Sequence, residues 1–263
     1  MKKEKFNSFS WSGADNKFLD QPHLSKCNNM FVGCYGGNTK AGQYKNEDGA
    51  FVTSGTEWEF SLILDAHNSA NCTELLLKIF NSVKDKIFNI FIKDNSLFNL
   101  NKFILKMFNE NKKKLSSVKG ETACLICARK ENYLYWFSIG DCLVYLLNDE
   151  LEKMGQYALN QRQFYEWVGE INTFDLKVPC YSSGTRELRK GNNIIILVTD
   201  GLLEYPKSPF LDNAFLYTFF TRNNLEKNIL EALKKVHEGK GRDSATIIGF
   251  SYKNNKEGAF PTG

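Results

Sequence analysis

Long apolar segments are absent from this chain of 263 residues, and no apolar segment follows the charged residues 1–5 (MKKEK). A transmembrane helix needs ~18 consecutive apolar residues, and a secretory signal needs a shorter apolar core behind its charged start. The sequence therefore predicts a protein that neither spans a membrane nor enters the secretory route. We expect a cytoplasmic location.

Regular cysteine spacing is also missing. The seven cysteines are an odd number without a repeated interval, which does not fit a disulfide framework. Cys124 and Cys127 form a CxxC motif, but they fall in an apolar run typical of a strand, where residues three apart point to opposite faces. We interpret them as small core residues rather than a zinc or redox pair, and we expect free thiols in a reducing compartment.

Charge of one sign is not concentrated in any part of the chain. The formal net charge is +4, and lysine and arginine are scattered along the sequence. The densest basic run, at residues 112–114, is interpreted as the solvated C-terminal end of a helix. Because no basic groove is evident, a nucleic-acid partner and a metal-dependent nuclease activity are both poorly supported.

Linkers rich in proline or serine, internal repeats and low-complexity segments are absent as well. One α+β domain is the economical interpretation, and a hydrophobic content of 42% supplies its core. We place this domain at residues 29–252, with an N-terminal extension at 1–28 and a polar, frayed tail at 253–263. We expect a monomer.

Hydrophobic periodicity predicts the elements of this domain. A meander of three antiparallel strands is expected at residues 122–128, 133–139 and 143–147, where the period is two. Residues 155–190 are irregular, apart from a short helix predicted at 163–168. The other predicted strands are 29–36, 49–53, 58–64, 193–199 and 246–250, and the predicted helices are 69–92, 97–108, 214–220 and 225–236.

Two apolar strands end in an aspartate. The first ends at Asp65, with His67 two residues later, and the second ends at Asp200. A carboxylate that is buried without a partner costs several kcal/mol, and a divalent cation is the strongest partner available. Brought side by side, the two strands would hold two carboxylates at one end of a sheet.

Further acidic residues lie beside other predicted strands: Glu47, Asp48, Asp141 and Asp243. Taken singly, each aspartate has another explanation, since Asp-Gly pairs mark turns and an aspartate can cap a turn. Taken together, carboxylates at strand edges along the full chain favour a metal centre. Oxygen ligands suit Mg²⁺ or Mn²⁺, whereas zinc prefers histidine and cysteine.

The order of these acidic motifs resembles that of the metal-dependent serine/threonine protein phosphatases of type 2C. The family carries Asn-Glu-Asp, Asp-Gly-His-Gly, Gly-Ser-Thr-Ala, Gly-Asp-Ser-Arg, Ser-Asp-Gly-Leu and Asp-Asn-x-Thr. The resemblance covers roughly residues 30 to 252. The corresponding segments here are Lys45–Val52 (KNEDGAFV), Asp65–Asn68 (DAHN), Gly120–Ala123 (GETA), Ile139–Cys142 (IGDC), Leu197–Leu202 (LVTDGL) and Arg242–Thr246 (RDSAT).

The resemblance implies a four-layer α-β-β-α sandwich, in which two antiparallel central sheets are flanked by helix pairs. It also implies two Mn²⁺ or Mg²⁺ ions that activate a water for attack on a phosphate monoester. Asp65 would bridge the ions, and His67 would protonate the leaving oxygen. The other implied metal ligands are Asp48, the carbonyl of Ala66, Asp200 and Asp243, with Asp141 at a third, weaker site. Glu47 would act through water or contact the ligands from behind.

The chain departs from the family where the phosphate is clamped. The family has an arginine five residues before the aspartate of Asn-Glu-Asp, and Gln43 stands there. Lys45, Lys40, Arg162 or Arg186 would have to replace it, although lysine lacks the bidentate fork of arginine. Ala66 and Asn68 replace glycines, and Cys142 replaces a serine.

Two hypotheses remain from the sequence. The first is a phosphoserine/phosphothreonine protein phosphatase, with a phosphoprotein substrate and a cognate serine/threonine kinase. The second is a catalytically weak or inactive relative that binds a partner. The irregular residues 155–190 match the family's flap, and the aromatic run at 164–168 is either a partner surface or a small satellite core, which we favour.

Overall fold

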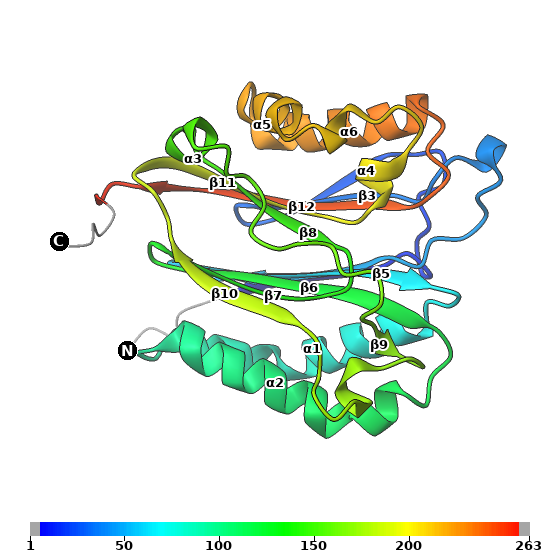
Figure 1. Ribbon diagram of the computed structural model, residues 1–263, viewed down its shortest axis with the longest axis horizontal. Coiled ribbons are helices and arrows are strands. Elements are labelled where there is room, and N and C mark those ends of the chain that lie inside the picture. The colour runs from blue at the N-terminus through cyan, green and yellow to red at the C-terminus, as the bar shows by residue number, and fades with distance from the viewer. Residues whose placement is uncertain (1–5, 258–263) are drawn as a thin grey trace.

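The computed structural model describes residues 6–257, which form four layers (Figure 1). One central sheet, sheet A, has seven strands in the order β1-β4-β5-β6-β7-β10, and β9 pairs with β6. Its neighbouring strands are antiparallel. The strands are β1 (Asn7–Ser12), β4 (Gly49–Ser54), β5 (Trp58–His67), β6 (Glu121–Lys130), β7 (Tyr133–Ile139), β9 (Val168–Gly169) and β10 (Ser182–Glu187).

The other central sheet, sheet B, has five antiparallel strands in the order β2-β3-β12-β11-β8. It packs face to face on sheet A through a buried apolar layer that includes Val52, Ile63, Leu125, Ile195 and Ile248. The strands are β2 (His23–Cys27), β3 (Met30–Tyr35), β8 (Leu143–Leu147), β11 (Gly191–Val198) and β12 (Ala245–Asn254).

Helices cover the outer face of each sheet (Figure 1). The amphipathic helices α1 (Asn71–Phe91) and α2 (Ser96–Leu115) bury their apolar stripes against sheet A. The helices α5 (Asn213–Thr221) and α6 (Leu225–Glu238) do the same on sheet B, together with the short α4 (Gly201–Glu204). The remaining short elements are α3 (Asp149–Lys153) and three 3-10 turns, η1 (Thr39–Ala41), η2 (Thr173–Asp175) and η3 (Pro209–Leu211).

The predicted sandwich is confirmed, and most predicted elements appear within a few residues of their expected bounds. Cys124 and Cys127 are both buried, one toward the helices and one between the sheets, as expected for residues three apart on a strand. Within the described part of the chain, no helix is long and apolar enough to cross a membrane.

The predicted N-terminal extension contains two strands of the central sheets. Residues 7–12 form β1, an edge of sheet A, and residues 23–27 form β2, an edge of sheet B. Edge strands have one hydrogen-bonded neighbour, so their apolar pattern is weaker than that of a central strand. At the other end, β12 extends to Asn254, and most of the predicted tail lies outside the described residues.

The predicted meander and one predicted helix also need correction. β6 and β7 form a hairpin, but β8 pairs with β11 in sheet B and not with β7. The change of sheet occurs at Gly140, whose φ of 89° is a conformation that favours glycine. Residues 163–168 form no helix; they contain a turn and lead into β9.

Candidate metal centre

The acidic residues singled out in the sequence gather at one end of the sandwich. Asp65 lies near the end of β5, opposite Ala123 of β6. Asp200 follows β11 and begins α4, and Asp243 precedes β12, which pairs with β11. Asp141 lies in the turn where the chain leaves sheet A for sheet B. The topology thus brings together carboxylates that are far apart in the sequence, from Asp48 to Asp243.

Asp48 is fully buried and accepts hydroxyl hydrogen bonds from sheet B. Ser244 Oγ donates to its Oδ1 at 2.8 Å, while Thr246 Oγ1 and Thr199 Oγ1 donate to its Oδ2 at 2.6 and 3.3 Å. A carboxylate has about four lone-pair positions, so one remains on Oδ1. Asp48 is therefore held rigidly behind the other carboxylates.

Asp65 and Asp141 are buried with oxygens that lack a partner. Asp65 is 5% exposed and its Oδ2 accepts no hydrogen bond, and Asp141 is 4% exposed and its Oδ1 accepts none. Buried polar atoms without partners are rare in native structures and indicate an ion or a water.

Burial and mutual repulsion raise the pKa values of Asp48, Asp65 and Asp200 and so favour their protonated forms. Burial, followed by the charges of Asp243 and Asp141, raises the pKa of Asp200 to about 7. Burial also raises the pKa of Asp48 to about 7, against the opposing effect of its hydroxyl donors. The pKa of Asp65 is raised by burial and then by the charge of Asp200. Such a cluster stores repulsion that a bound cation relieves.

Arg162 is a cation that contacts this cluster. Its guanidinium lies 3.3 Å from Asp141, 3.8 Å from Asp200 and 2.7 Å from Glu204, and its side chain is 17% exposed. The flanking residues fix it there, because Asn160 binds the turn at Cys142 and the Gln163 amide donates to the Gly140 carbonyl. Arg162, one of the predicted phosphate-binding residues, is thus paired with carboxylates.

His67 lies at the end of β5 beside Asp65, and its ring packs 4.7 Å from that of Trp167. Its Nδ1 is buried without a hydrogen-bond partner. Trp167 reaches this position because β9, which follows it, pairs with the start of β6. The pairing of Ala66 with Thr122 continues the strand, and the positive φ of this segment, 69°, falls on Asn68. Asparagine tolerates a positive φ. Because the positive φ falls on Asn68 and not on Ala66, the alanine at position 66 introduces no strain.

A cavity of about 590 Å³ opens beside these carboxylates. It is mixed in charge: Glu47 forms an ion pair with Lys45, and Lys240 and Arg242 also line the cavity. The lining residues are Gln43, Lys45, Glu47, Asp65, Ala66, His67, Asn68, Gly201, Glu204, Tyr205, Pro206, Lys240, Arg242, Asp243 and Ser244.

Among the charged lining residues, Glu204, Lys240 and Arg242 were given no role in the sequence analysis. Arg242 directly precedes Asp243, so its position beside a predicted metal ligand could have indicated that it lies at the site. Glu204 follows Asp200 by one helical turn, which places both side chains on one face of α4. Lys240 carries no such signal, because it reaches the cavity only through the turn after α6.

Arg186 lies elsewhere. It pairs with Leu134 on β7, five residues before Ile139, which is about 16 Å along the strand. Its guanidinium donates to Gln156 at 2.7 Å. The aromatic run at 164–168 is divided: Val168 and Trp167 pack inward, whereas Phe164 and Tyr165 are exposed.

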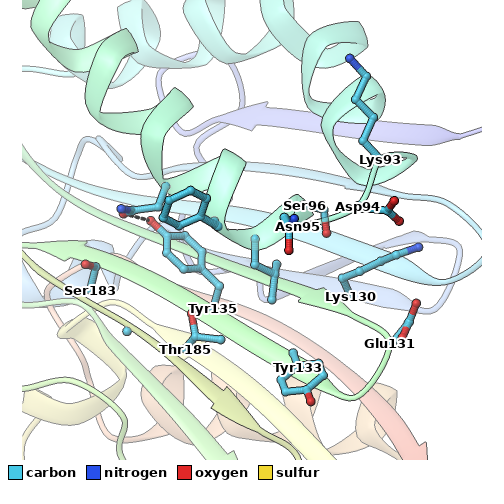
Figure 2. A pocket seen from close by; sticks show the side chains of 14 residues that line it. Lys93, Asp94, Asn95, Ser96, Lys130, Glu131, Tyr133, Tyr135, Ser183 and Thr185 are labelled. Atoms are coloured by element: carbon cyan, nitrogen blue, oxygen red, sulfur yellow. Dashed lines mark hydrogen bonds between the residues drawn. The ribbon is translucent and has the colours of Figure 1, made fainter.

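A second cavity of about 530 Å³ lies between the turn joining α1 to α2 and the strands β6, β7 and β10 (Figure 2). Tyr135 reaches across it and donates to Asn101 at 2.9 Å. Lys93, Lys130 and Glu131 lie at its rim (Figure 2). It contains none of the carboxylates described above, so the metal centre is the candidate active site.

The residues present fit divalent cations. The donor set consists mainly of carboxylates, two of which have buried oxygens without partners, and their charges repel one another. Hard cations such as Mg²⁺ and Mn²⁺ select oxygen donors of this kind.

Comparison with solved structures shows the type 2C phosphatase fold. A bacterial serine phosphatase variant aligns with a TM-score of 0.60 and 12% identity, over 94% of this chain and 99% of that chain. The Mycobacterium tuberculosis serine/threonine phosphatase PstP/Ppp aligns with a TM-score of 0.58 and 13% identity, over 95% and 99%. RsbX in complex with magnesium aligns with a TM-score of 0.55 and 14% identity, over 88% and 100%. No protein-family model and no curated protein sequence matches the chain.

Proposed function

We propose that this protein is a metal-dependent phosphoserine/phosphothreonine protein phosphatase. The observation that carries the proposal is that Asp65 and Asp243 line a cavity that also contains His67 and cationic side chains, with Asp200 close to both carboxylates. The fold neighbours support it, since they include serine/threonine phosphatases and one catalytic domain in complex with two manganese ions.

The carboxylates would hold two Mg²⁺ or Mn²⁺ ions, which when bound supply an activated water and neutralise charge on the phosphoryl group. Asp65, at the centre of the cluster, would be shared by both ions. Asp200 and Asp243 would complete one side, with Asp48, the Ala66 carbonyl and the water-mediated Glu47 on the other. Asp141 would serve a third, weaker ion.

The remaining residues bind the substrate and move the proton. His67 lines the cavity beside Asp65 and would donate a proton to the leaving seryl or threonyl oxygen. Gln43, Lys45, Lys240 and Arg242 line the same cavity and would hold the phosphate. Arg162 would add to this charge when a metal ion or phosphate releases it from the carboxylates. A phosphoprotein substrate implies a serine/threonine kinase acting on the same protein, and we propose a cytoplasmic monomer.

The test is hydrolysis of p-nitrophenyl phosphate and of a phosphothreonine peptide, with and without Mn²⁺. We expect turnover that depends on Mn²⁺ and is lost in Asp200→Asn, while the exposed Asp212→Asn, away from the cavity, retains it. Absence of metal-dependent turnover in folded protein would overturn the proposal.

A second candidate is a catalytically weak relative that binds phosphoproteins. The ion pairs of Arg162 with Asp141 and Asp200 favour it, because they occupy carboxylates that metal ions need. Binding of the phosphothreonine peptide without turnover, at saturating Mn²⁺, would select this candidate.

A further inference from the structure

Cys142 lies in the carboxylate cluster but has no role in the proposed function. It directly follows Asp141 in the turn between β7 and β8 and is fully buried. Its Sγ, one oxygen of Asp65 and one oxygen of Asp141 all lie within 4.8 Å of one another. Among residues 6–257, this is the one group of three such side chains with that geometry.

The two carboxylates of this group have spare ligand atoms. Asp65 Oδ2 and Asp141 Oδ1 are buried and accept no hydrogen bond, whereas the other oxygen of Asp141 faces Arg162. Asp141 can therefore bind a cation through Oδ1 while Arg162 remains on Oδ2. Both side chains are more than nine-tenths buried, so water does not freely satisfy these oxygens.

The turn that carries Asp141 and Cys142 is fixed. Asn160 donates to the Cys142 carbonyl at 2.8 Å and to Ser138 Oγ at 2.9 Å, and its own oxygen accepts from the Val144 amide at 2.9 Å. A buried side chain that makes three hydrogen bonds across a turn holds the turn in one conformation. The fold therefore holds the thiol beside the carboxylates.

We propose that Asp65, Asp141 and Cys142 form a mixed oxygen–sulfur site for one divalent transition-metal ion. The metal–sulfur bond forms as the S–H bond breaks, and the proton leaves to solvent. Ligands on one tetrahedral ion lie about 3.6 Å apart when the metal–oxygen and metal–sulfur bonds are about 2.1 and 2.3 Å. Since the three atoms lie within 4.8 Å of one another, they need to move inward by at most about 1 Å.

A thiolate ligand changes which metal the centre prefers. Thiolate is a soft donor that selects Zn²⁺, Co²⁺ and Cd²⁺ over Mg²⁺. The inference deepens the proposed function, because Asp65 belongs to both sites, but sulfur ligation is measurable without any turnover.

Cobalt is the probe, because a thiolate bound to Co²⁺ gives an intense near-ultraviolet charge-transfer band and carboxylates do not. The full chain is titrated with Co²⁺, and binding is followed by calorimetry and absorption together. We expect the band in wild type and its loss in Cys142→Ser. We also expect Cys142→Ser to bind Cd²⁺ roughly tenfold or more weakly, while its Mg²⁺ affinity changes less.

Cys180→Ser is the matched control, since Cys180 is the one exposed cysteine of the described chain and would account for adventitious cobalt. The band should persist in that variant. Absence of the band at saturating Co²⁺, or its persistence in Cys142→Ser, would overturn the inference. If Cys142→Ser does not fold, the zinc-edge X-ray absorption spectrum of the wild-type zinc complex decides, because sulfur in the coordination sphere supports the site and oxygen alone refutes it. A protein that shows the band but no phosphatase turnover would retain this site and lose the proposed function.

Discussion

At the scale of single residues, the candidate metal centre combines a rigidly held carboxylate with two side chains that the proposed reaction would use. Asp48 is fixed by three hydroxyl groups, whereas His67 packs on Trp167 and Arg162 pairs with carboxylates that the proposed ions would bind. These two residues therefore carry the predictions that separate catalysis from binding.

Replacing His67 by asparagine should slow hydrolysis of the phosphothreonine peptide roughly 10²–10⁴-fold in kcat, because an alkoxide leaves poorly without a general acid. Hydrolysis of p-nitrophenyl phosphate should change far less, since nitrophenolate is a good leaving group. The measurement is the ratio of the two kcat values. His23→Asn, in β2, is the control, and equal losses on both substrates would contradict the role of His67 as an acid.

Replacing Arg162 by alanine should tighten Mn²⁺ binding, because the guanidinium competes with the ion for Asp141 and Asp200. Removing a charge worth ~1 kcal/mol lowers the Kd about fivefold. Calorimetry measures the Kd directly. Arg186→Ala, on β10, removes an arginine away from the cluster and should leave the Kd unchanged. Weaker binding in Arg162→Ala would show that Arg162 positions the carboxylates instead.

At the scale of elements, the irregular segment after α3 supports the turn between β7 and β8. Asn160 forms three buried hydrogen bonds at that turn. Ala158, just before Asn160 in the sequence, forms a β-bridge with Tyr145. This segment therefore supports the turn that carries Asp141 of the candidate metal centre, although it contains little regular secondary structure.

Asn160→Ala should lower the free energy of unfolding by roughly 1–3 kcal/mol, because it leaves buried polar atoms of the turn without partners. Denaturant unfolding gives this difference. Asn109→Ala, which removes an exposed intrahelical hydrogen bond, is the matched control and should cost less than about 0.5 kcal/mol. An equal effect of both substitutions would contradict the structural role of Asn160.

The sequence predicts most elements because their periodicity reports burial on one face. The helices α1 and α2 and the strands β5 and β11 have strong patterns, and their ends locate Asp65 and Asp200. The edge strands β1 and β2 were missed because they are short and partly exposed. The change of sheet at β8 depends on tertiary pairing, which the local hydrophobic pattern does not report. For the same reason, the contact of Arg162 with the carboxylates and the approach of Cys142 to Asp65 had to come from the structure.

At the scale of the whole molecule, the carboxylate cluster couples stability to pH. The folded pKa values of Asp48 and Asp200 are raised from 3.8 to about 7, mainly by burial. A raised carboxyl pKa means that the folded state holds protons that the unfolded chain releases. The stability that the raised pKa values of these carboxyls contribute is complete below about pH 3.8 and is lost as the pH rises toward 7.

The metal-free protein should therefore lose stability between pH 5 and pH 8 from these groups, and Mn²⁺ should restore it. We expect the rise in Tm caused by Mn²⁺ to be larger at pH 8 than at pH 5.5, where protons compete for the carboxylates. Thermal unfolding at both pH values, with and without Mn²⁺, provides the measurement. A rise that is equal or larger at pH 5.5 would contradict the assignment of these carboxyls.

The three hydroxyl bonds to Asp48 also join the two sheets, because Asp48 precedes β4 of sheet A and its donors lie in or directly beside the ends of β11 and β12 in sheet B. The sheets cannot separate locally at this end without exposing a buried carboxylate and three hydroxyl groups at once. Backbone amides of β4 and β12 near Asp48 should therefore exchange with solvent deuterium only when the whole domain unfolds, whereas those of the edge strand β2 should exchange through local opening. The end of the sandwich that carries the proposed site would then be its slowest-exchanging part, with flexibility confined to the surrounding loops.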